Sequence, residues 1–174
     1  MKCRNSLWIA AIVSLSLASL GGNVAAFAQA DGREANKNFY WVNLGVGGSS
    51  FGGAYGLGVC GQFGWHLFSL RCTGAHNVET SQVGSEFSMH YGLGKRNRSA
   101  AFSLAVGAGV VQGNRHHGLY LYDFDPVWGF STEAQLFGRV ANNVGVGLSA
   151  LLNQNKEKDF LVFLLCVQFG KLWP

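Results

Sequence analysis

A scattered set of side chains suited to acid–base chemistry lies between residues 62 and 139. The set comprises two glutamines, two histidines, two arginines and two glutamates, namely Gln62, His66, Arg71, Glu86, His90, Glu133, Gln135 and Arg139. Carboxylate and imidazole groups can pass protons during catalysis, or they can pair with cations inside a folded chain. Three interpretations are therefore open: a catalytic or proton-relay site, a narrow conducting path, or a structural plug of paired charges.

A second group of polar and aromatic residues is concentrated in residues 112–126. The run GNRHHGLYLYDFDP contains His116, His117, Tyr120, Tyr122, Asp123 and Asp125. Aromatic side chains among mixed charges are typical of a recognition loop, and they also fit a strand extension with a polar tip. The histidines and aspartates suggest a metal site as a further alternative. Adjacent histidines have no geometric reason to share one ion, and the sequence lacks C-x-x-C and H-x-x-x-H spacings, so we expect no metal or other cofactor.

The kind of element that positions these groups is clearest in residues 55–67, which read YGLGVCGQFGWHL. Every second residue from Tyr55 to Leu67 is apolar or aromatic, apart from Gly61, and the intervening residues are mostly glycine or polar. A period of two predicts a β-strand, because successive side chains of an extended chain point to opposite faces. A soluble sheet would show water a face of charged residues and threonine. This pattern instead predicts a strand between lipid and a narrow polar lumen.

Eight segments with this alternation follow one another along the chain. They cover residues 38–48, 55–67, 67–74, 83–94, 101–111, 127–140, 144–152 and 160–170. Tilted strands of about ten residues are long enough to cross a bilayer, and eight is the smallest strand number of outer-membrane barrels. The sequence therefore predicts an all-β fold, an eight-stranded antiparallel up-and-down transmembrane β-barrel.

In such a barrel the alternation turns the acid–base set into the lumen. Burying an unpaired charge costs on the order of several kcal/mol, so these charges must find partners. Arg71 and Glu86 lie on neighbouring strands, and we expect them to form an ion pair. Glu133 and Arg139 share a strand and are expected to pair with neighbours.

The three cysteines after residue 30 follow the same alternation. Cys60 and Cys166 fall on the lumen side, whereas Cys72 falls on the outer side. A bridge between Cys60 and Cys72 would have to pass through the barrel wall. We therefore expect no disulfide framework.

The expected connections alternate in length. Longer ones fall at residues 49–54, 75–82, 112–126 and 153–159, and tight turns fall around residue 66, at 95–99 and at 141–143. Long loops outside and short turns in the periplasm are typical of outer-membrane barrels, and both chain ends would then be periplasmic. Aromatic residues near segment ends predict a girdle at the membrane interfaces, made by Trp41, Trp65, Tyr91, Trp128 and Trp173.

The N-terminal residues predict export. Lys2 and Arg4 precede an apolar run over residues 7–20, and small residues follow at 26, 28 and 30. This order indicates a signal peptide over residues 1–30 and a barrel domain over 31–174, with an uncleaved anchor as the alternative. Without the two N-terminal basic residues the net charge falls from +4 to +2, and no basic stripe follows, so we expect no nucleic-acid partner. Charged residues make up 13% of the chain, about half the usual soluble share.

Over about residues 37–170 this arrangement resembles the small eight-stranded outer-membrane barrels, which include the transmembrane domain of outer membrane protein A. The resemblance rests on strand number, connection lengths and size. It implies a monomer surrounded by outer-membrane lipid, with a lumen plugged by ionic side chains. Such barrels usually end on an aromatic residue that the insertion machinery recognises. Here the candidate is Phe169, and residues 170–174 follow it.

Lipid A-modifying barrels of the same size provide an enzymatic alternative. The deacylases among them use a His-x-Ser pair on the lipid-facing wall, whereas this chain has only the reversed, inward-pointing Ser88-Met89-His90. The palmitoyltransferases need an apolar lumen, which the polar set above does not provide. We therefore expect a structural or surface-interaction role without catalysis, with a surface ligand or host protein bound through the loops. A soluble lipocalin-like carrier of an apolar ligand is the second alternative, and it requires the aromatic face to turn inward.

Overall fold

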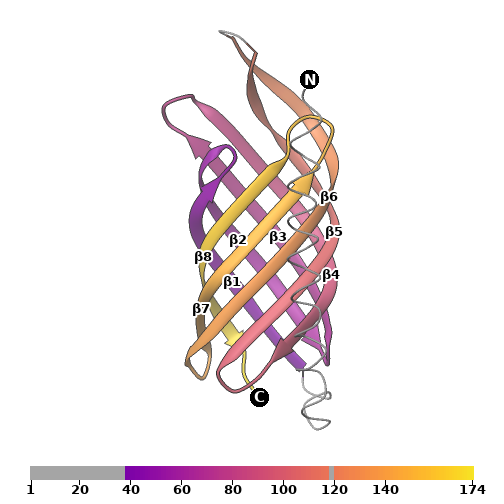
Figure 1. The fold of residues 1–174 in the computed structure, drawn as a ribbon, viewed down its shortest axis with the longest axis vertical. Helices are drawn as coiled ribbons and strands as arrows, with labels where there is room; N and C mark the ends of the chain where they lie inside the picture. Colours follow the sequence, from indigo (N-terminus) through magenta and orange to yellow (C-terminus); the bar gives the residue numbers. More distant parts are fainter. Residues whose placement is uncertain (1–37, 118–119) are drawn as a thin grey trace, which may run out of the picture. The chain divides into compact units, whose positions relative to one another are not determined.

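Eight antiparallel strands form the fold, and each pairs with the next along the chain (Figure 1). The strands are β1 (Asn38–Ser49), β2 (Gly52–Phe63), β3 (His66–Asn77), β4 (Gln82–Arg96), β5 (Ala100–His117), β6 (Tyr120–Ala141), β7 (Val144–Gln154) and β8 (Phe160–Lys171). β8 pairs with β1 and closes the barrel. The structure is a computed structural model that describes residues 38–117 and 120–174. The predicted signal peptide, residues 1–30, lies outside the described residues.

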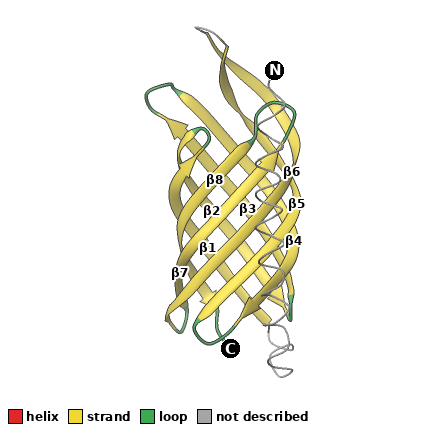
Figure 2. Cartoon of the chain, in the orientation of Figure 1, coloured by secondary structure: helices red, strands yellow, loops and turns green. Residues whose placement is uncertain are grey.

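The closed barrel confirms the predicted fold, and strands joined by loops make up the described chain (Figure 2). Within the described ranges, no helix is long and apolar enough to cross a membrane. We name the two ends of the barrel by what they carry. The ribbon end holds the connections after β1, β3, β5 and β7, and the tail end holds the other three turns and residues 172–174, the tail (Figure 1).

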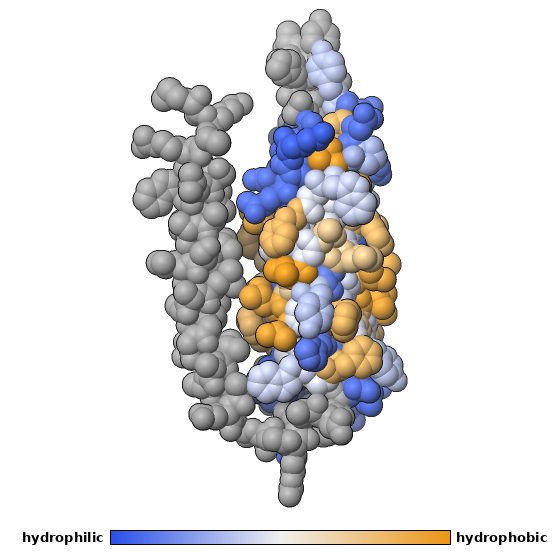
Figure 3. Space-filling model, turned by 90° about the vertical axis from the view of Figure 1, so that its right-hand side faces the viewer, coloured by the Kyte–Doolittle hydropathy of each residue, from blue (hydrophilic) through white to orange (hydrophobic). Residues whose placement is uncertain are grey.

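The outer wall is apolar and the interior is largely polar, as the alternation predicts. Large exposed apolar side chains line every strand, among them Tyr55, Leu70, Met89, Phe130 and Leu165. Figure 3 shows them as a band around the middle of one face, with hydrophilic residues towards both ends. An apolar belt of this extent needs lipid around it, because soluble proteins rarely expose such large apolar patches. The outward position of the aromatic face excludes the lipocalin alternative.

The turn between β2 and β3 corrects the strand predicted over residues 55–67. β2 ends at Phe63 and β3 begins at His66, so two residues separate the strands. Gly64 has a φ of 60°, a left-handed conformation that glycine adopts without strain. The alternation restarts after this turn, and Leu67 therefore points inward although the sequence placed it outside.

Two of the predicted loops are in fact paired strand. Only residues 50 and 51 connect β1 and β2, because Ser49 already pairs with Gly52. β5 and β6 continue through the predicted loop at residues 112–126 and pair as far as His117 and Tyr120. This pairing agrees with the strand extension that the sequence left open beside a recognition loop.

The predicted aromatic girdle is only partly correct. Trp65, Tyr91 and Trp128 are exposed on the outer wall. Trp41 and Trp173 are instead buried, with 2% and 8% of their surfaces exposed. Trp41 occupies an inward position of β1, and Trp173 folds back under the barrel with the tail. Cys60 and Cys166 lie inside and Cys72 outside, as the alternation predicts.

Candidate functional site

Six of the eight residues in the predicted acid–base set meet inside the barrel. Their side chains are buried, and they belong to β2, β3, β4 and β6: Gln62, Arg71, Glu86, His90, Glu133 and Gln135. The other two, His66 and Arg139, lie outside the lumen. The structure thus buries six of these side chains in the barrel and leaves two exposed.

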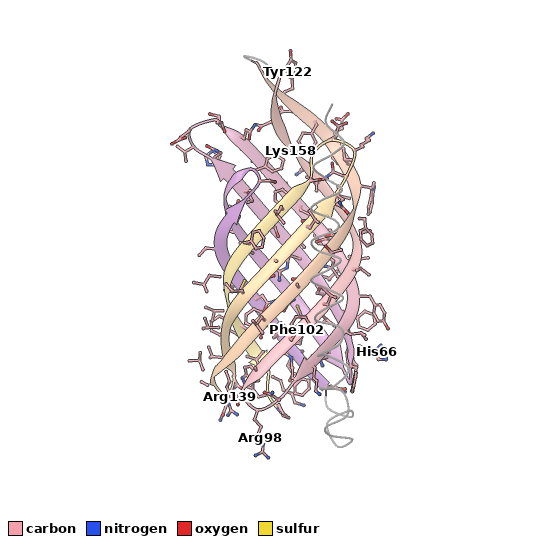
Figure 4. All side chains as sticks on the ribbon, viewed as in Figure 1. His66, Arg98, Phe102, Tyr122, Arg139 and Lys158 are labelled. Atoms are coloured by element: carbon pink, nitrogen blue, oxygen red, sulfur yellow. The ribbon has the colours of Figure 1, made fainter. Side chains whose placement is uncertain are left out.

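His66 lies on the outer wall near the tail end (Figure 4). The restart of the alternation after Gly64 turns it outward. Its Nδ1 lies 2.7 Å from the hydroxyl oxygen of Tyr91, and the two rings stack with centroids 6.0 Å apart. His66 therefore packs against Tyr91 on the outer wall and contributes nothing to the lumen.

Arg139 is exposed at the tail end, where β6 finishes (Figure 4). Its Nη1 donates a hydrogen bond to the backbone carbonyl of Arg98 (3.3 Å), and its Nη2 donates to Asn142. An inward position this close to the end of a strand lets a long side chain leave the lumen and bind turn residues. Arg139 therefore joins two turns and has no interior ion pair.

The central ion pair joins Arg71 to Glu133, and the predicted pair of Arg71 with Glu86 is wrong. Arg71 on β3 and Glu133 on β6 meet across the lumen, and each side chain is 1% exposed. Reasoning from neighbouring strands overlooked partners on opposite walls of a narrow barrel. A buried pair of this kind specifies the packing of the interior, because either charge alone would be costly.

Glu86 is held by neutral donors. Ser131 Oγ donates to Glu86 Oε1 at 2.9 Å, and Asn153 Nδ2 donates to the same oxygen at 3.0 Å. Hydrogen bonds to a carboxylate stabilise its charged form. These donors come from β6 and β7, so Glu86 also bridges the lumen.

His90 lies between two serine hydroxyls, each of which donates to a glutamate. Its Nε2 is 2.9 Å from Ser131 Oγ, and its Nδ1 is 3.3 Å from Ser69 Oγ. Ser69 in turn donates to Glu133 Oε2 at 2.8 Å. A continuous chain of polar groups thus connects the two glutamates through one imidazole. We call these residues together with Arg71 the interior polar network.

The interior polar network has the composition of an acid–base site but no route for a substrate. The serines, the histidine and both glutamates each expose no more than 4% of their surface. A lipid-modifying site of the deacylase kind would need such groups on the lipid-facing wall. The interior polar network is instead enclosed by the barrel wall.

Small polar residues complete the interior, and the alternation turns all of them inward except Asn153, which fell in a predicted connection. They are Asn43, Ser69, Thr73, Ser88, Ser103, Ser131, Ser149, Asn153 and Gln168, and all are buried. Gln135 links several of them, since its Oε1 accepts from Asn43 Nδ2 (3.4 Å) and from Gln168 Nε2 (3.3 Å). Sequence alternation thus gave the inward face of these residues, and the hydrogen-bond partners come from the closed barrel.

Some buried polar atoms of the lumen lack a hydrogen-bond partner within the protein. They include Asn43 Oδ1, Thr73 Oγ1, Glu86 Oε2 and Gln168 Oε1. Buried polar groups are normally satisfied by protein or by ordered water. Ordered water between the side chains would satisfy these atoms.

At the ribbon end, β5 and β6 extend past the rest of the barrel as a two-stranded ribbon (Figure 1). β4 pairs with β5 only up to Gly113, and in the described part of the chain β7 pairing with β6 begins at Phe130. We call residues 114–117 and 120–129 the ribbon. A bulge marks its base, where Val111 pairs with Val127 but Gly113 pairs with Phe124.

The ribbon contains the residues predicted for the recognition loop. Tyr122 lies near its tip (Figure 4) with 51% of its surface exposed, and Asp123 and Asp125 are exposed as well. The side chains of His116, His117 and Tyr120 lie outside the described residues. In the described part of the chain, no three metal-binding side chains lie together.

The two ends differ in charge. Exposed carboxylates at the ribbon end are Glu79, Asp123, Asp125 and Asp159, accompanied by the exposed Lys156. At the tail end the exposed charged side chains of the described chain are all basic, namely Arg98, Arg139 and Lys171. In the described part of the chain, the ribbon end is thus the more acidic of the two ends.

The sequence matches no protein-family model and no curated protein. Solved structures with a similar fold are outer-membrane barrels. The N-terminal β-barrel domain of Pseudomonas aeruginosa OprF is 14% identical, with a TM-score of 0.60 over 78% of this chain and 98% of that one. Yersinia pestis Ail in a phospholipid bilayer nanodisc is 13% identical (TM-score 0.54, 77% and 99%), and Neisserial surface protein A is 12% identical (0.52, 78% and 97%). The fold is therefore that of the small eight-stranded outer-membrane barrels.

Proposed function

We propose that this protein is an outer-membrane barrel with a plugged polar lumen that binds a partner protein at the cell surface through its ribbon. The observation that carries the proposal is the length of unpaired strand on the ribbon. In the described part of the chain, the β6 edge over residues 120–129 has no pairing with β7. An unpaired edge presents backbone N–H and C=O groups that a further strand can bind.

The side chains on the ribbon favour a selective partner over general aggregation. Asp123 and Asp125 place negative charge along the edge, and Pro126 removes one backbone donor. Charges and proline on an edge strand discourage pairing with arbitrary chains. We therefore propose an extended segment with basic side chains as the partner, docked beside the exposed Tyr122.

The interior supports a structural role for the barrel itself. Arg71 and Glu133 span the lumen at its charged centre, and the serine and amide side chains pack around them. A packed interior leaves the outward surface as the site of interaction. The proposal includes no catalytic step, because the interior polar network is enclosed and its histidine and serines are remote from lipid.

Membrane location and orientation are tested first. We expect the protein to fractionate with outer membranes and to migrate faster unheated than boiled in a detergent gel. Protease added to intact cells should cut within residues 114–129 and leave the barrel protected. A soluble protein, or cleavage only after the outer membrane is opened, would contradict the location or the orientation.

The surface role is tested by shortening the ribbon. Deleting residues 114–126 and joining the strands with a two-residue turn should lower the adherence of producing bacteria to cultured epithelial cells severalfold. The matched control shortens the β3–β4 turn at residues 78–80 and should leave adherence unchanged. Both variants must keep the mobility shift on heating. Equal adherence of wild type and ribbon variant would refute the surface-binding role.

A further inference from the structure

Arg96 is enclosed by aromatic rings at the tail end of the barrel. Its guanidinium carbon lies 3.7 Å from the ring centroid of Trp41, 5.9 Å from that of Trp173 and 6.0 Å from that of Phe39. The side chain is almost fully buried, with 5% of its surface exposed. Arginine stacks well on aromatic faces, and the attraction strengthens when water is excluded.

The same guanidinium holds the tail. Its Nη1 donates a hydrogen bond to the backbone carbonyl of Leu172 at 3.3 Å, and its Nε donates to Gln62 Oε1 at 3.2 Å. Gln62 is itself fixed, because its Nε2 donates to the carbonyls of Gly64 and Gly94 at 2.8 Å each. Arg96 thus joins the tail to three strands of the barrel wall.

The tail is packed as if it belonged to the interior. Leu172 is completely buried and Trp173 is 8% exposed, although both lie beyond the last residue of β8. Gly170, two residues before Leu172, has a φ of 149°, a backbone conformation that other residues rarely adopt. Trp173 reaches the β7 side, where a Cβ on Gly145 would lie 3.3 Å from its ring. These contacts place two apolar side chains across the end of the lumen.

Buried polar atoms lie near these side chains on the lumen side. Cys60 pairs with Trp41 across β1 and β2, and its Sγ accepts from Asn43 Nδ2 at 3.6 Å. Trp41 Nε1, Trp173 Nε1, Asn43 Oδ1 and Gln168 Oε1 are buried without a protein partner. Polar atoms of this kind need water, so the space between the tail and the central ion pair is suited to hydration.

We propose that Leu172 and Trp173 form a stopper that closes the tail end of a hydrated lumen, and that Arg96 is the latch that holds it. When the stopper is displaced, water and small solutes reach the lumen as far as the Arg71–Glu133 pair. Closure is then a property of the tail and can be altered without changing a strand.

Cys60 provides the test, because it lies behind the stopper. The full chain is prepared with Cys60 as its only cysteine, through Cys3→Ser, Cys72→Ser and Cys166→Ser. The probe is a small, positively charged methanethiosulfonate reagent in water, and the readout is the rate of modification of Cys60 in detergent-folded protein. Three variants are compared with this parent: Trp173→Ala, Arg96→Met, and a chain that ends at Lys171.

We expect slow labelling of the parent and at least about tenfold faster labelling of all three variants, because losing about 1.4 kcal/mol of closure changes the open fraction by that factor. Arg98→Met is the matched control, since Arg98 is an exposed arginine at the same end and points away from the barrel (Figure 4). Its labelling rate should equal that of the parent.

Each variant is first checked for the mobility shift on heating, so that only closed barrels are compared. Should Arg96→Met fail to fold, the chain that ends at Lys171 gives the same test with all eight strands intact. Fast labelling of the parent would show that the lumen is already open and would overturn the proposal. Equally slow labelling of the folded variants would overturn it as well, because closure would then not depend on the stopper.

Discussion

Both ends of the barrel carry a cation against an aromatic ring, but the two contacts are built differently. At the tail end the guanidinium of Arg96 lies 3.7 Å from the Trp41 centroid, and at the ribbon end the amine of Lys158 lies 3.9 Å from the Phe51 centroid. Phe51 also packs against Phe160, with centroids 5.3 Å apart. Nearly equal distances therefore conceal different environments.

The environment decides what each contact contributes. Arg96 is buried among three rings and donates to two hydrogen-bond acceptors. Lys158 is only partly buried beside one ring and donates to one acceptor, the backbone carbonyl of Ser50 at 3.3 Å. Cation–π contacts are worth about 0.5–1 kcal/mol at exposed sites and about 2 kcal/mol or more when water is excluded. The comparison teaches that distance alone does not rank such contacts, and that burial of the cation does.

The largest expected effect comes from the charged centre that separates the two ends. Glu133→Gln leaves the buried Arg71 without its counterion and should lower the free energy of unfolding by about 3–5 kcal/mol. Urea titration in lipid vesicles, followed by tryptophan fluorescence, measures the change. Glu79→Gln removes an exposed carboxylate and should change stability by no more than about 0.5 kcal/mol. Equal effects of the two substitutions would contradict the central role of the ion pair.

The next effect separates the ends directly. Arg96→Met keeps an unbranched side chain but removes the cation and both hydrogen bonds, and should cost about 2 kcal/mol or more. The same titration applied to Arg98→Met should show a change of less than about 0.5 kcal/mol. If Arg96→Met lowered the free energy of unfolding no more than Arg98→Met, the comparison would fail, because burial would then add nothing to the strength of the cation–ring contact.

The smallest effect is expected at the ribbon end. Lys158→Met should change the free energy of unfolding by less than about 1 kcal/mol, because partial exposure weakens the contact with Phe51. A loss of stability as large as that of Arg96→Met would show that the two cation–ring contacts contribute equally.

The pH dependence of Lys158 sharpens this point. Partial burial lowers the pKa of the Lys158 amine from its ordinary value of 10.5. The unfolded chain therefore binds more protons between the lowered pKa and 10.5, and stability rises with pH in that window. Wild type should gain slightly over Lys158→Met as the pH increases through it, as unfolding titrations at a series of pH values would reveal. A relative loss would mean that the ring holds the charged amine more strongly than burial opposes it.

The sequence placed residues best where one rule acts along a single strand. The alternation in β4 and β6 correctly assigned Glu86, His90 and Glu133 to the interior and their neighbours to the outer wall. It failed at His66 and Leu67, because the turn at Gly64 begins a new strand in which the inward and outward positions are exchanged. The sequence left the ribbon open between a loop and a strand extension, since a strand outside the membrane need not show the apolar alternation.

The sequence by itself determined the number of strands, the sides they present and the polar character of the lumen, because a period of two is a local property of the extended chain. Only the tertiary structure decided that Arg71 pairs with Glu133 across the lumen, and that Trp41, Arg96 and Trp173 meet at the tail end. These partners lie on strands far apart in the chain, and closure of the barrel brings them together. Alternation fixes the face of a side chain, whereas the partner depends on the register and curvature of all eight strands.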